Sequence, residues 1–370
     1  MNLVIIKNNL KEALGVVERA TSENANLPIL KNVWLGGVGG AIRLVATNLE
    51  IAISTTVPGK VIEEGNITVP AAVLRELVSN LPSERVSLEV KGGGLSIQTD
   101  NYHATIQGLP TEDFPIVPKI KDGNQYVRMK SGPLKDALTQ VVVSAQFSEL
   151  RPELNSVLWD FKIDEIKIAA TDSFRLSEKS IPAGQFETNQ TESSRMLIPL
   201  RTAQELTRIL PEDEEVEIKK DASQVLFRTE QTELISRLVD GNFPDYGAIV
   251  PKDFETQVSL SRQELLNALR LAGVFSSRVN EVRIRIPENK KNIEVFSVDQ
   301  TVGENNYLLP AKIQGKAREI SFNWRYLTDG LKAIKTDEVF WGLNEENRPA
   351  LLKSPKEASY FYVLMPILKA

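Results

Sequence analysis

Few side chains in this sequence could carry out catalysis. Cysteine is absent and His103 is the single histidine, which excludes thiol chemistry, disulfides and a histidine-rich metal site. Two carboxylates, Asp172 and Asp240, could act as the acid and base of a hydrolase. Asp172 follows a predicted strand and precedes Arg175, as a residue of an active site can. An acid–base hydrolase is therefore one alternative to consider.

The position of Asp172 recurs elsewhere in the chain, which favours a structural role for it. Asn48 and Asp299 follow two other predicted strands at the equivalent place. Asp and Asn side chains at such turns accept hydrogen bonds from the backbone. The segment Lys91–Gly94 predicts a hairpin turn rather than a phosphate-binding loop, because it does not lead from a strand into a helix. We accordingly expect no catalytic residue, no cofactor and no metal site.

The composition is that of a soluble protein with substantial cores. The chain has 370 residues, 42% of them hydrophobic and 25% charged, which predicts two or three domains. No apolar run is long enough to span a bilayer, and the N-terminus does not have a secretory pattern. The absence of cysteine fits a reducing cytoplasm. Because the net charge is -5, any nucleic acid would have to bind to one positively charged face.

The elements that must position any site repeat three times along the chain. Leucine pairs at Leu10–Leu14, Leu134–Leu138 and Leu265–Leu269 each continue with a small apolar residue seven positions after the first leucine. Such spacing predicts an amphipathic helix with one buried face. The pattern recurs about every 125 residues, a period much longer than that of solenoid repeats.

A second helix and a strand recur with the same period. Helices are predicted to begin near Pro70, Pro199 and Asn323, where proline suits a first helical turn and asparagine an N-cap. Alternating apolar residues predict strands at 42–47, 166–171 and 293–298.

We therefore predict three homologous domains of the α+β class. Each has two helices packed on an antiparallel sheet, and the domains are residues 1–123, 124–251 and 252–370. Three such domains in tandem leave an unpaired sheet edge at each end, and a head-to-tail homodimer would pair both edges in a six-domain ring. We expect these edges at Tyr102–Gln107 and at Val274, Phe275 and Val282–Ile286.

Positive charge is concentrated in the predicted helices. The six helical stretches have more Lys and Arg than Asp and Glu, and the rest of the chain is correspondingly acidic. A ring lined by such helices would attract phosphates without reading sequence, and could slide along them. The cations expected to face such a polyanion are Lys7, Lys11, Arg75, Lys135, Arg201, Arg208, Arg262, Arg270, Arg278, Arg325 and Lys332.

Five segments distributed along the chain carry motifs of a known family: Asn26–Leu30, Thr171–Leu176, Asp240–Tyr246, Phe322–Tyr326 and Tyr362–Pro366. In order and content they resemble the bacterial DNA polymerase III beta subunit, or sliding clamp, family. The resemblance implies a homodimeric ring in the cytoplasm that encircles duplex DNA and tethers the replicative polymerase as a processivity factor. It also implies loading by an ATP-driven clamp loader, and no catalysis by the clamp itself.

In that family, partners insert short linear peptides into a hydrophobic cleft between the second and third domains. The implied partners are the polymerase III alpha subunit, clamp-loader subunits and other replication and repair proteins, with no membrane contact. Carried over residue by residue, the cleft consists of Leu154, Thr171, Phe174, Arg175, Leu176, Pro244, Ile249, Asn323, Tyr326, Val363, Leu364, Met365, Pro366 and Ile367.

The resemblance also implies a dimer interface at Ala104, Ile106, Val274 and Phe275. Ala104 stands where a bulky aromatic residue can seal the interface in the family, so we expect closure to depend on the other three side chains. A scaffold that binds peptides without DNA is a further alternative to the clamp and to the hydrolase.

Overall fold

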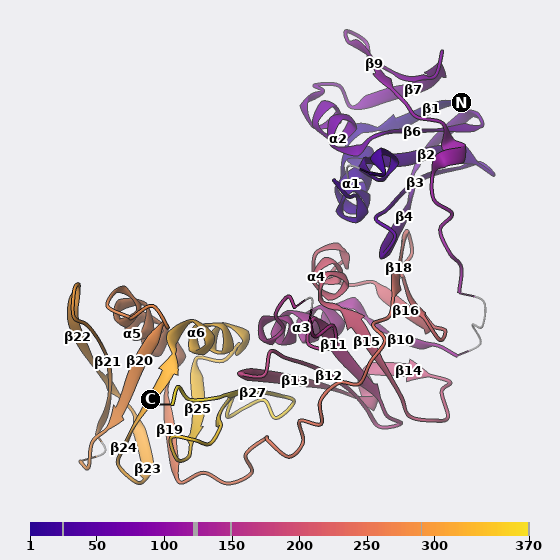
Figure 1. Ribbon diagram of the computed structural model, residues 1–370. Helices are drawn as coiled ribbons and strands as arrows, with labels where there is room; N and C mark the ends of the chain where they lie inside the picture. Colours follow the sequence, from indigo (N-terminus) through magenta and orange to yellow (C-terminus); the bar gives the residue numbers. More distant parts are fainter. Residues whose placement is uncertain (24–25, 121–124, 149, 290, 369–370) are drawn as a thin grey trace. The chain divides into compact units, whose positions relative to one another are not determined.

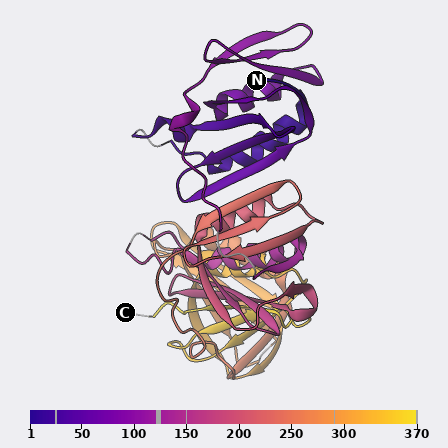
Figure 2. The ribbon, with the colours of Figure 1, turned by 90° about the vertical axis from the view of Figure 1, so that its right-hand side faces the viewer.

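The computed structural model describes residues 1–23, 26–120, 125–148, 150–289 and 291–368. Their contacts divide the chain into two compact units, which Figures 1 and 2 present from two sides. The first unit comprises Met1–Gly132, Phe186–Gln190 and Arg208–Leu238, and the second comprises Pro133–Gln185, Thr191–Thr207 and Val239–Ala370. The residues of the second predicted repeat are thus divided between the two units.

The helices of the described residues come in pairs, two for each predicted repeat. They are α1 (Lys7–Val17), α2 (Ala71–Asn80), α3 (Ser131–Val141), α4 (Leu200–Ile209), α5 (Arg262–Val274) and α6 (Trp324–Ala333). On α1 the side chains of Leu10, Leu14 and Val17 are fully buried, which confirms the predicted apolar face. Each such side chain stabilises the fold by about 2 kcal/mol.

The predicted helix starts are confirmed at Asn323 and wrong by one residue at the two prolines. Asn323 Oδ1 accepts hydrogen bonds from the backbone N–H groups of Arg325 at 3.0 Å and Tyr326 at 3.4 Å, so it caps α6. Pro70 and Pro199 are instead the last residues of the strands that precede α2 and α4.

The first unit contains two antiparallel sheets. The five-stranded sheet has the order β5 (Gly59–Glu63), β1 (Asn2–Ile6), β7 (Arg85–Lys91), β8 (Gly94–Gln98), β9 (His103–Gln107). The nine-stranded sheet has the order β14 (Phe186–Thr188), β10 (Val127–Lys130), β16 (Glu215–Lys220), β17 (Gln224–Arg228), β18 (Thr232–Arg237), β4 (Ile51–Val57), β3 (Ala41–Thr47), β2 (Asn32–Val38), β6 (Gly65–Pro70). The turn between β7 and β8 is the predicted hairpin, with φ of 57° at Gly92 and 81° at Gly93, a conformation that glycine adopts most readily.

The second unit repeats this organisation, again with antiparallel strands. Its nine-stranded sheet has the order β15 (Ser194–Pro199), β11 (Ser156–Phe161), β12 (Glu165–Thr171), β13 (Arg175–Pro182), β27 (Tyr360–Leu364), β26 (Ala350–Lys353), β25 (Glu338–Leu343), β19 (Thr256–Ser261), β23 (Lys312–Gly315). Its four-stranded sheet has the order β22 (Gly303–Pro310), β21 (Asn292–Asp299), β20 (Glu281–Ile286), β24 (Arg318–Asn323). Each repeat therefore divides its strands between two sheets, where the sequence suggested a single one.

Successive repeats are joined by one recurring strand pair. In the first junction, β4 of the first repeat pairs with β18 of the second, so that Ile53 lies opposite Leu234. In the second junction, β13 of the second repeat pairs with β27 of the third, so that Ser177 lies opposite Tyr362. The strands that correspond to these but have no partner in another repeat are β9 in the first repeat and β22 in the third. Each is a terminal strand of its sheet.

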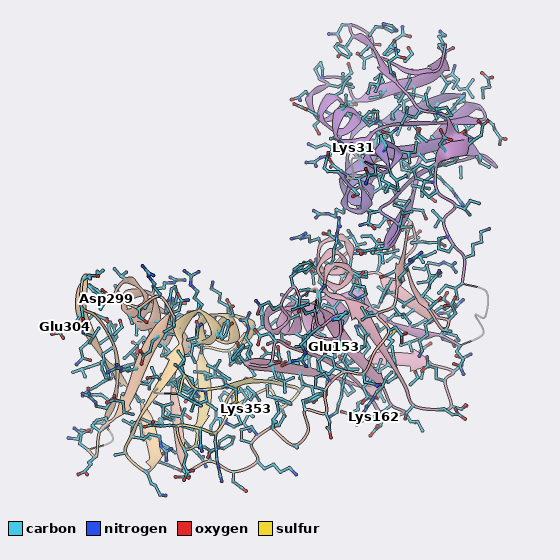
Figure 3. The ribbon with its side chains drawn as sticks, viewed as in Figure 1. Lys31, Glu153, Lys162, Asp299, Glu304 and Lys353 are labelled. Atoms are coloured by element: carbon cyan, nitrogen blue, oxygen red, sulfur yellow. The ribbon has the colours of Figure 1, made fainter. Side chains whose placement is uncertain are left out.

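One predicted edge is confirmed and the other is wrong. Strand β9 coincides with the predicted edge at Tyr102–Gln107 and pairs only with β8 in its sheet. Strand β20, which covers the predicted edge at Val282–Ile286, is paired on both sides, with β21 and β24. The edge strands of that sheet are β24 and β22, and Glu304 lies on β22 (Figure 3).

The two helices and the antiparallel strands of each repeat agree with the predicted α+β class. The exact domain boundaries stay predictions, and the first, between 123 and 124, falls outside the described residues. Among the described residues, no helix combines the length and the apolar character needed to cross a membrane.

Candidate peptide-binding cleft and cationic surface

Asp172 is part of a tight turn between β12 and β13. Its Oδ1 accepts hydrogen bonds from the backbone N–H groups of Phe174 at 2.9 Å and Arg175 at 3.0 Å, and only 7% of the residue is exposed. The Thr171 hydroxyl donates to the carbonyl of Arg175 at 2.7 Å and accepts from the N–H of Ser173 at 3.2 Å. These bonds hold Ser173 at a positive φ of 78° and fix where Phe174 projects.

A turn in which an Asp or Asn side-chain oxygen accepts backbone hydrogen bonds occurs in all three repeats. Asn48 Oδ1 accepts from the backbone of Glu50 and Ile51, and Asp299 Oδ1 accepts from Thr301 and Val302. The hydrogen bonds from Thr301 and Val302 lower the pKa of Asp299. The recurring Asp or Asn therefore stabilises a turn, as the sequence indicated. This structural role accounts for the position of Asp172 without a catalytic role.

Strands β13 and β27 form the floor beneath this turn. Leu176 lies opposite Val363, and Arg175 opposite Leu364. Beyond the strand ends, the N–H of Met365 donates to the carbonyl of Phe174 at 2.8 Å, and that of Ile367 to Ser321 at 2.8 Å. The segment 365–367 is therefore held to the second repeat at one point and to the third at another.

Arg175 is fixed by groups from two repeats. Its Nε donates to Asp172 Oδ2 at 2.9 Å, its Nη1 donates to Asp329 Oδ2 at 2.6 Å, and its guanidinium stacks on the ring of Tyr326. Burial alone would lower the pKa of Arg175, but Tyr362, Asp329 and Asp172 raise it, so the guanidinium stays charged. Arg175 was predicted as a cleft residue, and these contacts indicate that it positions other groups there.

Helix α6 packs closely on β27 because of a glycine. A Cβ on Gly330 would lie 2.5 Å from the ring of Tyr362, so any larger residue would push the helix away. This close approach lets the Tyr362 hydroxyl donate to the carbonyl of Tyr326 at 2.8 Å. Asn323, which caps α6, and Tyr326 are therefore held at a fixed position relative to β27.

The segment between the second and third repeats packs on the sheet of the second unit. Phe243 and Tyr246 pack on the buried side chains of Leu158, Ala169 and Leu197, and Pro244 lies between them in sequence. The Tyr246 hydroxyl donates to Glu178 Oε2 at 2.7 Å; burial and this carboxylate raise the Tyr246 pKa. The carbonyl of Tyr246 accepts a hydrogen bond from the N–H of Ile249 at 3.1 Å.

The predicted cleft residues differ in how accessible they are. Phe174 is 59% exposed and Ile249 is 48% exposed. An intermediate part of the residue is exposed in Arg175, Pro244, Asn323, Tyr326, Met365, Pro366 and Ile367. Buried, by contrast, are Leu154, Thr171, Leu176, Val363 and Leu364. A ligand could thus contact the first two sets directly, while the buried set forms the packing beneath them.

The predicted cations fall into groups according to their contacts. Lys7 donates to the carbonyl of Leu81, Arg75 pairs with Glu18, Arg262 donates to the carbonyl of Thr336, and Arg325 donates to Asn280. Side-chain or electrostatic interactions also engage Lys135, Arg201 and Arg208. Exposed and without an ion-pair partner among the residues that the structure describes are Lys11, Arg270, Arg278 and Lys332. Arg278 follows the end of α5 and is not on a helix.

The predicted interface residues lie on or beside the edge strands β9 and β22. Ala104 and Ile106 are on β9, where Ile106 is 7% exposed, and His103 Nε2 is 3.1 Å from the Ser96 hydroxyl. Val274 ends α5 and is 65% exposed. The ring of Phe275 lies 3.7 Å from where a Cβ of Gly303 would be, so it borders the start of β22.

Sequence reasoning missed Asp329, one of the groups that hold Arg175. Asp329 lies three residues after Tyr326 on α6, a spacing that places both on one helix face and that could have identified it. In the described part of the chain, no three His, Asp or Glu side chains gather in a way that could hold a metal ion.

Comparison with known proteins gives matches over the whole chain. Residues 1–118, 128–245 and 248–368 match family models described as the N-terminal, central and C-terminal domains of the DNA polymerase III beta subunit. A curated beta sliding clamp from Synechococcus elongatus is 31% identical, with 99% of each chain covered, and one from Bacillus subtilis is 27% identical with the same coverage. The crystal structure of the B. subtilis sliding clamp covers 100% of both chains with 26% identity and a TM-score of 0.93.

Proposed function

The chain belongs to the DNA polymerase III beta subunit family, and on this premise we propose that it is a sliding clamp. Two copies close head to tail into a ring around duplex DNA in the cytoplasm, and the ring acts as a processivity factor for the replicative polymerase. It catalyses no reaction and needs no cofactor. The proposed domains are residues 1–123, 124–251 and 252–370.

The observation that carries the proposal is the recurring strand pair of the two junctions. Strand β4 pairs with β18 and β13 with β27, which leaves β9 and β22 as the corresponding strands with a free edge. If the third junction forms between two copies in the same way, the edges at β9 and β22 are both closed within the ring. Free edges of this kind otherwise favour aggregation.

The register of the subunit contact follows from the two junctions. Ile53 opposite Leu234 and Ser177 opposite Tyr362 are equivalent pairs in the repeats. The equivalent residues in the two edge strands are Ala104 on β9 of one copy and Asn305 on β22 of the other. Ile106 then lies opposite Gly303, beside the ring of Phe275, and the exposed Val274 is close enough to be covered.

The helices supply the contact with DNA. Lys11, Arg270 and Lys332 are exposed helical cations without an ion-pair partner among the described residues, so their charges are available to phosphates. Contacts with phosphates carry no sequence information, as a sliding protein requires. The same exposed cations favour the clamp over a scaffold that binds peptides alone.

The cleft of the second junction receives the partners. The exposed Phe174 and Ile249, together with the partly exposed Met365, offer apolar contacts to a short peptide. Arg175, held by Asp172 and Asp329, fixes the shape of the site. We infer that the partners are the polymerase III alpha subunit, clamp-loader subunits and other replication and repair proteins.

Retention on DNA of different topology tests the proposal. A closed ring stays on circular DNA and is lost from the same DNA after linearisation, because it can leave over the ends. Light scattering should give twice the 41.2 kDa of one chain. Equal retention on circular and linear DNA, or a persistent monomer, would contradict the clamp.

A further inference from the structure

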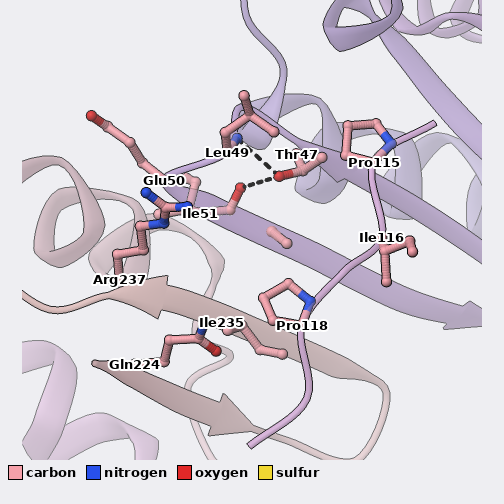
Figure 4. Close-up of a pocket in the computed structure, with 11 residues that line it drawn as sticks. Thr47, Leu49, Glu50, Ile51, Pro115, Ile116, Pro118, Gln224, Ile235 and Arg237 are labelled. Carbon is pink, nitrogen blue, oxygen red and sulfur yellow. Dashed lines mark hydrogen bonds between the residues drawn. The ribbon is translucent and has the colours of Figure 1, made fainter. Parts of the chain in front are cut away.

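The first junction contains a pocket for which the proposed function has no use (Figure 4). Its volume is about 260 Å³, and it lies wholly within the first unit. The turn between β3 and β4, the strands β17 and β18, and the segment that leaves the first repeat surround it. The lining residues are Thr47, Leu49, Glu50, Ile51, Ala52, Pro115, Ile116, Pro118, Gln224, Ile235 and Arg237.

The turn beside this pocket has the hydrogen bonds of the turn beside the peptide cleft. The Thr47 hydroxyl donates to the carbonyl of Ile51 at 2.9 Å and accepts from the N–H of Leu49 at 3.1 Å. Thr171 makes the two equivalent bonds at the cleft. Leu49 has a φ of 76°, and the equivalent residue of the second turn has 78°. The two turns are therefore copies of one local structure.

The strands behind the two turns correspond as well. The N–H of Arg237 donates to the carbonyl of Glu50 at 3.0 Å, just as that of Met365 donates to Phe174. Ile235 lies opposite Ala52, in the place of Val363 opposite Leu176. In Figure 4, Pro115, Ile116 and Pro118 follow the connecting segment on one side of the pocket, and Gln224, Ile235 and Arg237 lie on strands across from it.

The pocket lining includes solvent-exposed apolar side chains and one cation without an ion pair among the described residues. Ile51 and Ile235 form a buried floor with 2% and 8% exposure, whereas Leu49 is 44% exposed and Ile116 is 95% exposed. Arg237 stands where the cleft has Met365, is exposed, and forms no ion pair among the described residues. An occupant that covers the isoleucine and leucine and presents a carboxylate to Arg237 would satisfy both features.

We propose that this pocket is a second peptide-binding site, specific for a short linear peptide with an apolar side chain next to a carboxylate. The inference rests on the proposed function, because the class of ligand is that of the equivalent cleft. The apolar side chain enters between Leu49 and Ile116, and the carboxylate accepts hydrogen bonds from the Arg237 guanidinium. Since the volume lies just below the lower limit of small-ligand pockets, about 300 Å³, only one or two side chains fit. Affinity is accordingly lower than at the cleft.

Methyl-labelled isoleucines allow both sites to be observed in one experiment. Ile116 and Ile235 report on the pocket, and Ile249 and Ile367 report on the cleft. The probe is acetyl-Asp-Leu-Leu-amide, added to the full-length protein while the methyl NMR signals are followed. We expect saturable shifts at both pairs of isoleucines, with different dissociation constants. Acetyl-Asn-Leu-Leu-amide, which lacks the carboxylate, should bind the pocket about fivefold more weakly.

Two variants test the pocket without disturbing the core. Leu49→Asn removes the apolar side chain and introduces a residue that tolerates the positive φ of this position. Arg237→Gln removes the positive charge. Each should weaken binding at the pocket about fivefold and leave the cleft unchanged. Arg237→Gln should also abolish the preference for the Asp peptide over the Asn peptide. Ile163→Ser is the matched control, because Ile163 is 72% exposed and lines neither site. It should leave both affinities unchanged.

The outcomes separate this inference from the proposed function. Shifts confined to Ile249 and Ile367 that neither variant alters would overturn the second site and leave the cleft intact. Shifts confined to Ile116 and Ile235 that both variants weaken would support the second site and contradict the proposed cleft. Absence of shifts at all four isoleucines at millimolar peptide would overturn the inference.

Discussion

The guanidinium carbon of Arg175 lies 4.2 Å from the centre of the Tyr326 ring. Arg175 begins β13 in the second repeat, and Tyr326 is in the first turn of α6 in the third. Asp329, one turn further along α6, accepts a hydrogen bond from the same guanidinium. One side chain thus fixes a strand and a helix from successive repeats at the centre of the proposed cleft.

Arg175→Lys should damage the cleft although it keeps the positive charge. A lysine cannot donate to Asp172 and Asp329 in the same planar geometry, and it stacks less well on Tyr326. We expect the free energy of unfolding to fall by about 2 kcal/mol and peptide affinity to fall with it. Urea denaturation and fluorescence titration with a cleft-binding peptide measure the two effects. In the control Arg195→Lys, the side chain is 72% exposed and pairs with Asp160, so both quantities should change little.

Arg270→Glu should weaken binding to duplex DNA and reduce its dependence on salt. Arg270 is exposed on α5 and has no ion-pair partner among the described residues, so its charge is available to a phosphate. Loss of one phosphate contact lowers the slope of log K against log salt by about 1. Titrations of a short duplex at several salt concentrations give this slope. Lys312→Glu reverses a charge that is also exposed, on β23, and a slope that changes as much there would contradict the assignment to helices.

The repeats and their turns could be predicted from the sequence because they are local. Apolar periodicity identified the buried face of α1, and the recurrence of Asn48, Asp172 and Asp299 identified their turns. The sheet edge of the third repeat could not be predicted, because alternation along β20 does not reveal that strands pair on both its sides.

Partners distant in sequence were beyond prediction for the same reason. Arg175 and Asp329 are 154 residues apart and meet only because β27 pairs with β13 and α6 packs on β27. The pocket of the first junction combines segments from two repeats in the same way. The cleft residues themselves came from the family resemblance, and their contact with a peptide stays a prediction.

Acid should remove the contribution of Glu217 to stability. Partial burial acts to raise the pKa of Glu217, but hydrogen bonds from Lys219 and Arg128 outweigh it and lower the pKa. A carboxylate with a lowered pKa stabilises the fold above its unfolded value, near 4.3, and this stabilisation disappears as the pH falls through the folded pKa. Because solvent screens the cluster, Glu217→Gln should lower the free energy of unfolding by only about 0.5 kcal/mol at pH 7 and by less at pH 3.

Urea denaturation at the two pH values measures this difference. Glu346→Gln removes an exposed carboxylate without an ion pair among the described residues and serves as the control. If the difference in free energy of unfolding between wild type and Glu217→Gln grew as the pH fell, this prediction would be contradicted.

The subunit register can be tested by cross-linking, because the natural chain contains no cysteine. In the proposed interface Ala104 of one copy lies opposite Asn305 of the other, since Ile53 lies opposite Leu234 and Ser177 opposite Tyr362 in the two junctions. Ala104→Cys combined with Asn305→Cys should therefore form disulfides between subunits on mild oxidation, because opposite residues have Cβ atoms within about 5.5 Å. Both interfaces of the ring would be closed, and the covalent dimer should remain on circular DNA in denaturant. Ala104→Cys with Glu304→Cys is the matched control, because adjacent residues of a strand point to opposite faces of the sheet. Efficient cross-linking of the control pair in place of the first would place the two strands in a different register.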